Sequence, residues 1–356
     1  MHQKPYKNSK NGVIRMFKNI TNVLQKHKWR KLAEKALEKK TLTGFYNHNY
    51  KLYDGDTPYL FRFPIKDAPR MDPRAFEEQD VLKLLSGQSI SVPKLICDDL
   101  EKGFYVEAFI DGFTLDNRYP PGKKIPEKYL DQIAQFYYDT TQLETGAFKG
   151  IIDKAWPTSG SNALFFEAVC AFSEKVFERS RKTHGKYYDF LGLGDDPYAV
   201  LKEKAKDLAE RPWCFMHADL HRGNIMVDHQ DKLWFIDWEL GLYGDILLCI
   251  AAHLHRTRYF EAEREMLIDK IKQQLPRDFL INFDQDLDFY LTFEAMKSVI
   301  TDTVRFPQAF KEEKFSTKRE AEYCLYYSDN LNRIAPLLGC KTATPSDALH
   351  WFQEWG

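Results

Sequence analysis

The chain has 356 residues, of which 44% are hydrophobic and 29% charged, so it has enough apolar side chains for two lobes or two small domains. No apolar run approaches the roughly 20 residues that a membrane helix needs. The first residues lack the apolar segment of a secretory signal, so we expect a cytoplasmic protein that does not engage a membrane. The six cysteines include no C-x-x-C pair, which argues against a zinc site and against a disulfide framework.

The formal net charge of −1 hides an uneven distribution. Residues 1–40 carry twelve Lys and Arg against two Glu, which leaves 39 basic and 50 acidic residues in the rest of the chain. An acidic body argues against nucleic acid as a partner, because neutralising phosphates needs a basic face. Residues 1–40 therefore form a basic N-terminal extension, and apolar residues at helical spacing within it predict an amphipathic helix over residues 22–40 that docks on the lobe that follows.

Residues 41–112 change to short strands with one helix. We expect two strands around a tight turn in residues 42–52, and another strand over residues 59–63. The first turn contains only Gly44, so it is a weak candidate for a loop that covers phosphates.

A helix is predicted over residues 72–85, because Asp72 is a suitable N-cap, proline follows it, and apolar residues recur at helical spacing. A strand is then expected over residues 103–115, with the Asp111-Gly112 pair as its exit turn. Beyond it the pattern is helical, and the predicted helices cover residues 126–143, 164–182, 197–210, 264–275, 287–306 and 317–337. His253 and His255 would point about 200° apart on a helix, which favours polar-network histidines over metal ligands.

The most informative stretch has the spacing H-x-D-x-x-x-x-N, formed by His217, Asp219 and Asn224, and a short apolar hairpin then leads to Asp237. The polar connection at residues 228–231 is typical of a hairpin, so Asn224 and Asp237 should lie on neighbouring strand ends. Asp219 in the preceding loop offers a proton acceptor, while the other two offer oxygen ligands for a hard cation such as Mg²⁺. This combination favours phosphoryl transfer.

In the form HADLHRGNIMV followed by WFIDWE, the stretch resembles the aminoglycoside phosphotransferase family with its choline-kinase and homoserine-kinase relatives. The resemblance implies an α+β, protein-kinase-like fold with a β-rich nucleotide lobe (residues 41–112) and a helical catalytic and substrate lobe (residues 113–356). It implies ATP and Mg²⁺ as cofactors. Asp219 would be the catalytic base or orient the substrate, Asn224 and Asp237 would bind the metal, and His217 would brace the loop.

The resemblance also implies a nucleotide site. Arg62 stands where kinases place a lysine that contacts the α and β phosphates, and arginine can still bridge phosphate and carboxylate bidentately. Glu78 would be its partner, with Glu77 as the alternative. If Arg62 is a surface residue instead, Lys51 or Lys66 takes its place. The remaining candidates are Asn47 in the first hairpin and the adenine-binding segment Glu107, Ala108 and Phe109.

A looser similarity, carried by TGFYNHNY, EAFIDGFTL and IDWELGLYGD, is to the bacterial branch that includes viomycin and capreomycin phosphotransferases. It implies inactivation of a basic antibiotic. The acidic body favours a polycationic acceptor, and the helix from residue 287 carries a polar stripe that includes Ser298 and Thr301. The candidate acceptor-binding residues are Glu239, Asp245, Glu294 and Asp302.

Other functions stay open at this point. A metabolite kinase of the choline or homoserine type would use the same machinery. A metal-dependent hydrolase with His217, Asp219 and His221 as ligands would leave Asn224 and Asp237 unexplained. A catalytically silent binding protein is disfavoured because no key catalytic residue is missing.

Overall fold

The computed structural model describes residues 26–39, 41–42, 46–65, 73–312 and 316–356. The chain forms two compact units. The described part of the smaller unit comprises residues up to 65 together with residues 85–87 and 92–111, and that of the larger unit comprises residues 73–84, 88–91 and most of 112–356. None of the helices formed by described residues has the length and apolar character that crossing a membrane requires.

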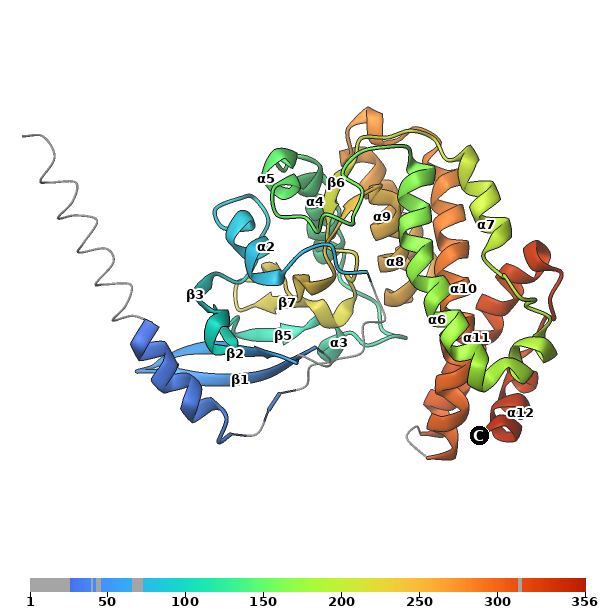
Figure 1. The fold of residues 1–356 in the computed structure, drawn as a ribbon, viewed down its shortest axis with the longest axis horizontal. Coiled ribbons are helices and arrows are strands. Elements are labelled where there is room, and N and C mark those ends of the chain that lie inside the picture. The colour runs from blue at the N-terminus through green and yellow to red at the C-terminus, as the bar shows by residue number, and fades with distance from the viewer. Residues whose placement is uncertain (1–25, 40, 43–45, 66–72, 313–315) are drawn as a thin grey trace, which may run out of the picture. The chain divides into compact units, whose positions relative to one another are not determined.

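The smaller unit contains an antiparallel sheet in the order β1-β2-β4-β3 (Figure 1). Its strands are β1 (Asn47–Asp54), β2 (Thr57–Pro64), β3 (Leu95–Asp99) and β4 (Phe104–Ala108). The β1–β2 hairpin closes at Gly55 and Asp56, and the positive φ of Gly55 suits this two-residue turn. Leu42 bridges Asn49, whereas Gly44 lies outside the described residues.

A helix over residues 26–36 covers the apolar core of this sheet. Trp29, Ala33 and Ala36 recur every three to four residues and are buried against sheet residues such as Phe61. Arg30 fixes the helix further, because its guanidinium donates to both oxygens of Asp99 at 2.6 and 3.1 Å. The predicted docked helix is confirmed over residues 26–36; residues 22–25 and 40 lie outside the described part of the chain.

The larger unit contains two small sheets. One joins β5 (Gly112–Thr114), β7 (Ile225–Asp228) and β8 (Leu233–Phe235), and the other pairs β6 (Cys214–Met216) with β9 (Leu242–Gly244). The single strand predicted over residues 103–115 is wrong, because the segment divides into β4 and β5, which belong to different sheets. A Cβ at Gly112 would collide with the carbonyl oxygen of Val227, so glycine is what permits β5 to lie against β7.

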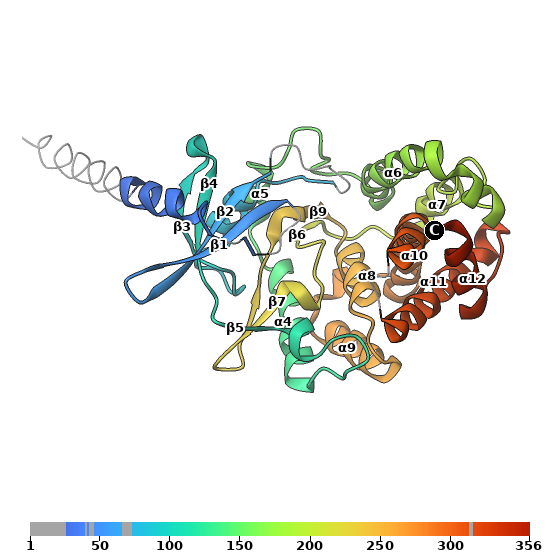
Figure 2. The same ribbon diagram turned by 90° about the horizontal axis from the view of Figure 1, so that it is seen from below.

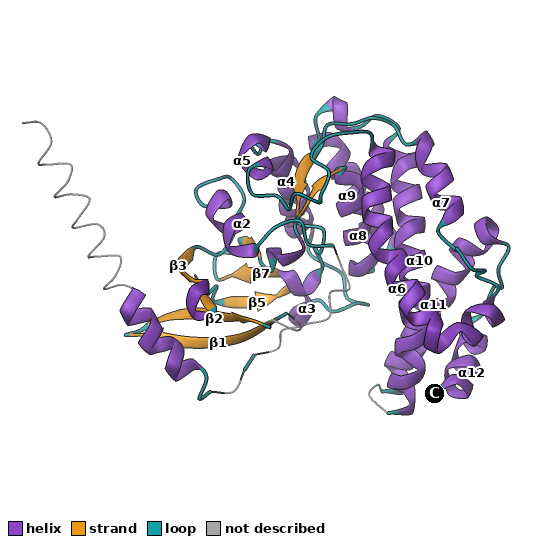
Figure 3. Cartoon of the chain, viewed as in Figure 1, coloured by secondary structure: helices purple, strands orange, loops and turns teal. Residues whose placement is uncertain are grey.

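Helices form the rest of the larger unit (Figure 3). They are α2 (Glu78–Leu85), α3 (Leu115–Arg118), α4 (Glu127–Thr141), α5 (Thr145–Lys149), α6 (Asn162–Leu191), α7 (Ala199–Lys204), α8 (Ile246–Thr257), α9 (Glu261–Gln274), α10 (Phe283–Lys311), α11 (Thr317–Leu338) and α12 (Pro345–Trp355). Single turns of 3-10 helix add η2 (Ala205–Asp207), η3 (Arg222–Asn224), η4 (Trp238–Leu240) and η5 (Arg277–Phe279) to the larger unit, whereas η1 (Leu100–Lys102) belongs to the smaller one. The long helix α10 packs against α6, α8, α11 and α12 (Figure 2).

The helix predicted from residue 72 begins later, at Glu78. Residues 73–77 are not helical because tertiary contacts hold them in another conformation. The ring of Phe76 packs edge-on against Phe148 and Phe215, and the carbonyl oxygen of Ala75 accepts a hydrogen bond from the Asp153 amide at 2.8 Å. The late start makes Glu78 a first-turn residue, whereas the prediction placed it inside the helix. Asp72, the predicted N-cap, lies outside the described residues.

Candidate active site

The loop after β6 is tied to the end of β8 through a buried histidine. The Nε2 atom of His217 lies 2.8 Å from the carbonyl oxygen of Ile236, and its Nδ1 atom accepts from the Asp219 amide at 3.3 Å. Burial lowers the pKa of His217 to about 4, so the ring is neutral and carries its proton on Nε2. The expectation that His217 braces the loop is therefore confirmed.

Asn224 joins the two acids of the motif. Its side-chain Nδ2 donates to the carbonyl oxygen of Asp219 at 2.9 Å, and its own carbonyl oxygen accepts from the Ile236 amide at 3.0 Å. Ile236 immediately precedes Asp237, which adopts a left-handed conformation (φ 66°) where β8 gives way to η4. The predicted hairpin is confirmed, and it brings together Asp219, Asn224 and the strand end that carries Asp237.

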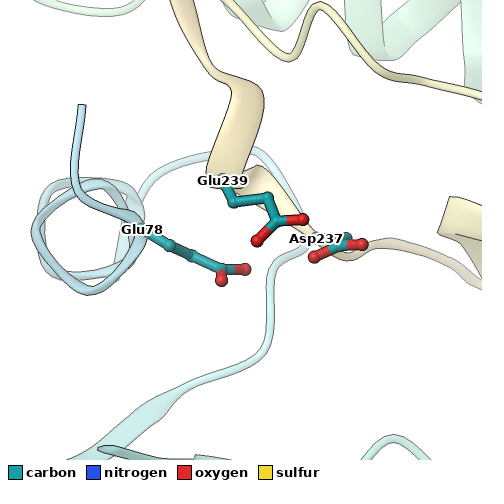
Figure 4. Close-up of side chains that lie close together, drawn as sticks. All are labelled: Glu78, Asp237 and Glu239. Atoms are coloured by element: carbon teal, nitrogen blue, oxygen red, sulfur yellow. The ribbon is translucent and has the colours of Figure 1, made fainter. Parts of the chain in front are cut away.

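Three carboxylates meet beside this hairpin. Glu78 of α2, Asp237 and Glu239 of η4 each place a carboxylate oxygen within 4.8 Å of the others (Figure 4). Glu78 is further fixed because its Oε1 accepts from the Trp238 amide at 3.0 Å, and Glu239 has Arg74 at 3.4 Å. Carboxylate oxygens at such spacing are the donors that a hard divalent cation prefers. The sequence analysis assigned Glu239 to the acceptor and did not foresee that its carboxylate lies beside those of Glu78 and Asp237.

Asp219 has a partner that the sequence did not reveal. The guanidinium of Arg256, in the last turn of α8, forms an ion pair with Oδ1 of Asp219. The other carboxylate oxygen, Oδ2, lies 3.4 Å from Nδ2 of Asn224 and 4.0 Å from Nε2 of His221. Arg256 directly follows the histidine pair, but only the tertiary structure shows that it reaches the loop that carries Asp219.

The nucleotide candidates of the smaller unit lie on neighbouring strands. Arg62 of β2 is buried, and its Nη1 lies 3.6 Å from Oε1 of Glu107 on β4. Ala108 follows on the same strand, and the ring centroid of Phe109 lies 3.8 Å from Nζ of Lys51. Asn47 begins β1 opposite Pro64. Arg62 and Glu78 belong to different units, so their pairing stays a prediction, as does the role of each residue in nucleotide binding.

One predicted acceptor residue has a structural position instead. Asp245 is fully buried and accepts from Nε and Nη2 of Arg211 at 3.1 and 2.7 Å. It also caps α8 through the Leu247 amide and accepts from the Tyr290 hydroxyl. With its oxygens engaged inside the unit, Asp245 has no surface for a substrate, so the expectation that it binds the acceptor is corrected.

Glu294 and Asp302 of α10 are buried too, so the polar stripe does not form a solvated face. Burial raises the pKa of Glu294, but the nearby charges of Lys297 and Arg256 outweigh it and hold the pKa below its usual value. Burial raises the pKa of Asp302 to about 7, against the opposing charges of Arg305 and Arg258. Glu294 is therefore an ionised group in the interior.

The remaining polar residues of the stripe make internal hydrogen bonds. Ser298 lies 2.7 Å from Nε2 of His255 and 3.1 Å from the Tyr326 hydroxyl. Thr301 donates to carbonyl oxygens of its own helix. His253 is held between the carbonyl oxygen of Leu220 and the Tyr259 hydroxyl. The prediction that His253 and His255 belong to a polar network is confirmed.

Comparison with known proteins agrees with this geometry. Residues 40–278 match the model of the phosphotransferase enzyme family (APH), which spans more than half of the chain. The chain belongs to this family. It is therefore a phosphotransferase enzyme, and the family match covers Arg62, Asp219, Asn224 and Asp237 but ends before α10. No match is found among curated protein sequences.

Solved structures show the same fold. The Plasmodium vivax ethanolamine kinase aligns with a TM-score of 0.55 at 15% identity, over 84% of this chain and 80% of that one. The choline kinase LicA of Streptococcus pneumoniae aligns with a TM-score of 0.50 at 19% identity, over 84% of this chain and 92% of that one. A ternary complex of aminoglycoside phosphotransferase APH(4)-Ia with AMP-PNP and hygromycin B aligns with a TM-score of 0.50 at 13% identity, over 84% of this chain and 92% of that one. The phosphotransferase thus has the expected protein-kinase-like fold, and its acceptor has to be inferred from its own residues.

Proposed function

We propose that this phosphotransferase moves the γ-phosphate of ATP, with Mg²⁺, onto a hydroxyl group of a small cationic acceptor. The observation that carries the proposal is the direct link of Asn224 to Asp219 and, through Ile236, to the strand end that holds Asp237. Family membership supports the reaction type. We also propose a cytoplasmic location, where ATP is abundant.

The roles follow from the chemistry of the side chains. Asp219 is placed to orient the acceptor hydroxyl and take its proton as the acceptor oxygen bonds to the γ-phosphorus. Asn224 and Asp237 offer amide and carboxylate oxygens, with Glu78 and Glu239 close by, and this donor set fits Mg²⁺. Bound Mg²⁺ would neutralise charge on the β and γ phosphates. Arg62 is the residue that we propose for the phosphates of the nucleotide.

A cationic acceptor is supported by two features of the chain. The residues after the basic extension carry 50 acidic against 39 basic side chains, which attracts cations over long range. Glu294 keeps its charge despite burial and lies close enough to Arg256, the partner of Asp219, for their charges to interact. We therefore propose an aminoglycoside or basic peptide antibiotic, of the viomycin and capreomycin kind, whose phosphorylation would inactivate it.

A second candidate is a choline or ethanolamine kinase, because two of the structures with the same fold bear those names. Choline and ethanolamine are also cationic alcohols, so the proposed machinery serves either acceptor. The hydrolase reading loses its support, because His217 already uses both ring nitrogens in hydrogen bonds to Ile236 and Asp219. A ring with both nitrogens engaged has no lone pair to offer a metal.

The test is a screen for ADP release from Mg-ATP with hygromycin B, other aminoglycosides, viomycin, choline, ethanolamine and homoserine as acceptors. Asp219→Asn should cut turnover on the order of 10²-fold or more while nucleotide binding stays nearly intact. Asp237→Ala should weaken binding of ATP only when Mg²⁺ is present, as measured by calorimetry. Asp231→Asn, an exposed carboxylate of the same hairpin, is the matched control. Full activity of Asp219→Asn would contradict the proposal.

A further inference from the structure

Arg256 occupies a position that neither the motif nor the proposed roles explain. Its guanidinium is paired with Oδ1 of Asp219, and its side chain is 30% exposed while that of Asp219 is 17% exposed. We propose that Arg256 is a positioning residue: it holds one oxygen of the Asp219 carboxylate so that the other, Oδ2, faces the acceptor hydroxyl. This inference rests on the proposed function, because it assigns Arg256 a part in the reaction proposed for Asp219.

The backbone around Arg256 is tied to the catalytic loop on both sides. Before it in α8, Nδ1 of His253 lies 3.0 Å from the carbonyl oxygen of Leu220, the residue after Asp219. After it, Nε of the loop residue Arg222 donates to the carbonyl oxygen of Thr257 at 2.9 Å. Since these contacts fix the last turn of α8 against the loop, the guanidinium meets Asp219 from a rigid support. An ion pair between such pre-positioned groups loses little side-chain freedom on forming.

Arg222 itself is anchored firmly. It is buried, and its guanidinium donates to the carbonyl oxygens of Tyr119, Pro120 and Lys123 in addition to that of Thr257. The loop, the segment before α4 and the end of α8 are therefore one hydrogen-bonded assembly. The backbone at position 256 is consequently held in a fixed position relative to the loop, which is what a positioning role requires.

The two oxygens of Asp219 have different surroundings. Oδ1 is paired with Arg256, whereas the contacts of Oδ2 among the described residues are a long one of 3.4 Å with Asn224 and a 4.0 Å approach of His221. Without Arg256 the carboxylate could rotate about its Cβ–Cγ bond and present either oxygen. With it, Oδ2 is the oxygen left to receive a hydroxyl proton, since a contact of 3.4 Å is easily replaced by a shorter one.

The reaction balances with this arrangement. The acceptor O–H bond breaks and its proton goes to Oδ2 of Asp219, while the acceptor oxygen bonds to the γ-phosphorus. The bond from that phosphorus to the bridging oxygen breaks, and its electron pair stays on ADP. Arg256 keeps its positive charge throughout and bonds neither proton nor phosphorus, so its effect on the rate should depend on Asp219.

The experiment is a double-mutant cycle in which Arg256→Ala, Asp219→Asn and the double variant are compared with the unmodified enzyme. The turnover number is measured with an acceptor from the screen and, with water as acceptor, as hydrolysis of Mg-ATP. Arg256→Ala should lower turnover on the order of 10-fold to 10²-fold and change KM for ATP by less than about twofold. The double variant should be no slower than Asp219→Asn alone. Arg264→Ala removes an arginine that is 29% exposed and paired with Glu261, and it should have normal activity.

A chemical rescue separates positioning from folding. Guanidinium chloride at millimolar concentration should restore part of the turnover of Arg256→Ala and none in the double variant. Normal turnover of Arg256→Ala, absence of rescue, or losses that add in the double variant would overturn the inference. The conservative variant Arg256→Lys supplies a folded protein if Arg256→Ala is unstable, and it should keep the charge but lose part of the turnover. Full activity of Asp219→Asn would instead overturn the proposed function.

Discussion

At the scale of single residues, the interior of the larger unit contains carboxylates with opposite behaviour. Glu294 stays ionised because the cations around it outweigh its burial, whereas the pKa of Asp302 is raised to about 7 because burial outweighs Arg305 and Arg258. Asp302 lies 3.6 Å from Arg305, whose side chain is largely exposed, so its compensation is weak.

This difference predicts a pH-dependent effect of Asp302→Asn on stability. The native protein holds a proton on Asp302 up to about pH 7, whereas the unfolded chain loses it near pH 4, so the carboxyl stabilises the fold less as pH rises between these values. Asparagine, which never ionises, should raise the free energy of unfolding at pH 8 by up to about 4 kcal/mol and change it little at pH 4. Urea unfolding at both pH values measures this. A destabilisation by Asp302→Asn that is larger at pH 8 than at pH 4 would instead mean that the arginines stabilise the carboxylate.

The grouping of the motif residues in space could be predicted because these residues are close in sequence. Asp219, Asn224 and Asp237 are linked by one loop and one hairpin, and local spacing is enough to bring them together. Arg256 and Glu78 reach the same region from other elements, where side-chain direction depends on how helices pack. For the same reason the burial of Asp245 by Arg211 was not foreseen: its partner is 34 positions away, in a loop.

At the scale of elements, helix α8 carries two neutral histidines, and one of them contacts the loop that holds Asp219. Burial lowers the pKa of His253 to about 3 and that of His255 to about 4. Both rings make their hydrogen bonds as neutral groups, to Leu220 and Tyr259 in one case and to Ser298 and Tyr326 in the other. Protonating either ring in the folded state would disturb the support of the loop.

These histidines predict acid lability. Above about pH 6.5 they are neutral in the folded and unfolded chain, but at lower pH the unfolded chain binds protons that the native protein excludes until about pH 4. Each histidine should therefore lower the free energy of unfolding by about 1.4 kcal/mol for every unit that the pH falls within this window. His255→Gln should reduce the measured slope by about that amount, whereas His350→Gln, at an exposed position, should not. An unchanged slope in His255→Gln would show that His255 titrates normally.

Element boundaries show where sequence patterns stop being informative. The predicted helices of the larger unit that correspond to α4, α6, α9, α10 and α11 were found because their apolar faces repeat over several turns, whereas α8 was not among the predicted helices. The start of α2 was misplaced because Phe76 joins an aromatic cluster, and the strand before Gly112 divides because β5 pairs with a distant strand. Helix α12 was missed although Thr344 and Pro345 form a recognisable N-terminus. Packing decides the first two cases, and local signals alone could have found the third.

At the scale of the whole molecule, charge is the property that bears on the acceptor. The body is acidic, yet its candidate acceptor carboxylates each have a cation nearby: Glu239 has Arg74, Glu294 has Lys297, and Asp302 has Arg305. A cationic acceptor must therefore gain binding energy in two ways. It is attracted by the summed field of the acidic body, and it replaces these cationic side chains beside the carboxylates. Such long-range attraction is screened by salt, whereas short contacts between buried groups are screened much less.

The acceptor proposal therefore predicts a specific salt dependence. Choline and its neutral isostere 3,3-dimethylbutan-1-ol have the same shape, so the ratio of their kcat/KM values, or of their Kd values, reports the charge term alone. This ratio should favour choline at low ionic strength and fall several-fold when salt shortens the Debye length from about 30 Å to about 8 Å. Glu294→Gln should lower the ratio further with ATP affinity unchanged, whereas Glu265→Gln, which removes an exposed carboxylate of α9, should not. A preference for the neutral alcohol, or a ratio that ignores both salt and Glu294→Gln, would place the positive charge of the acceptor outside the influence of α10.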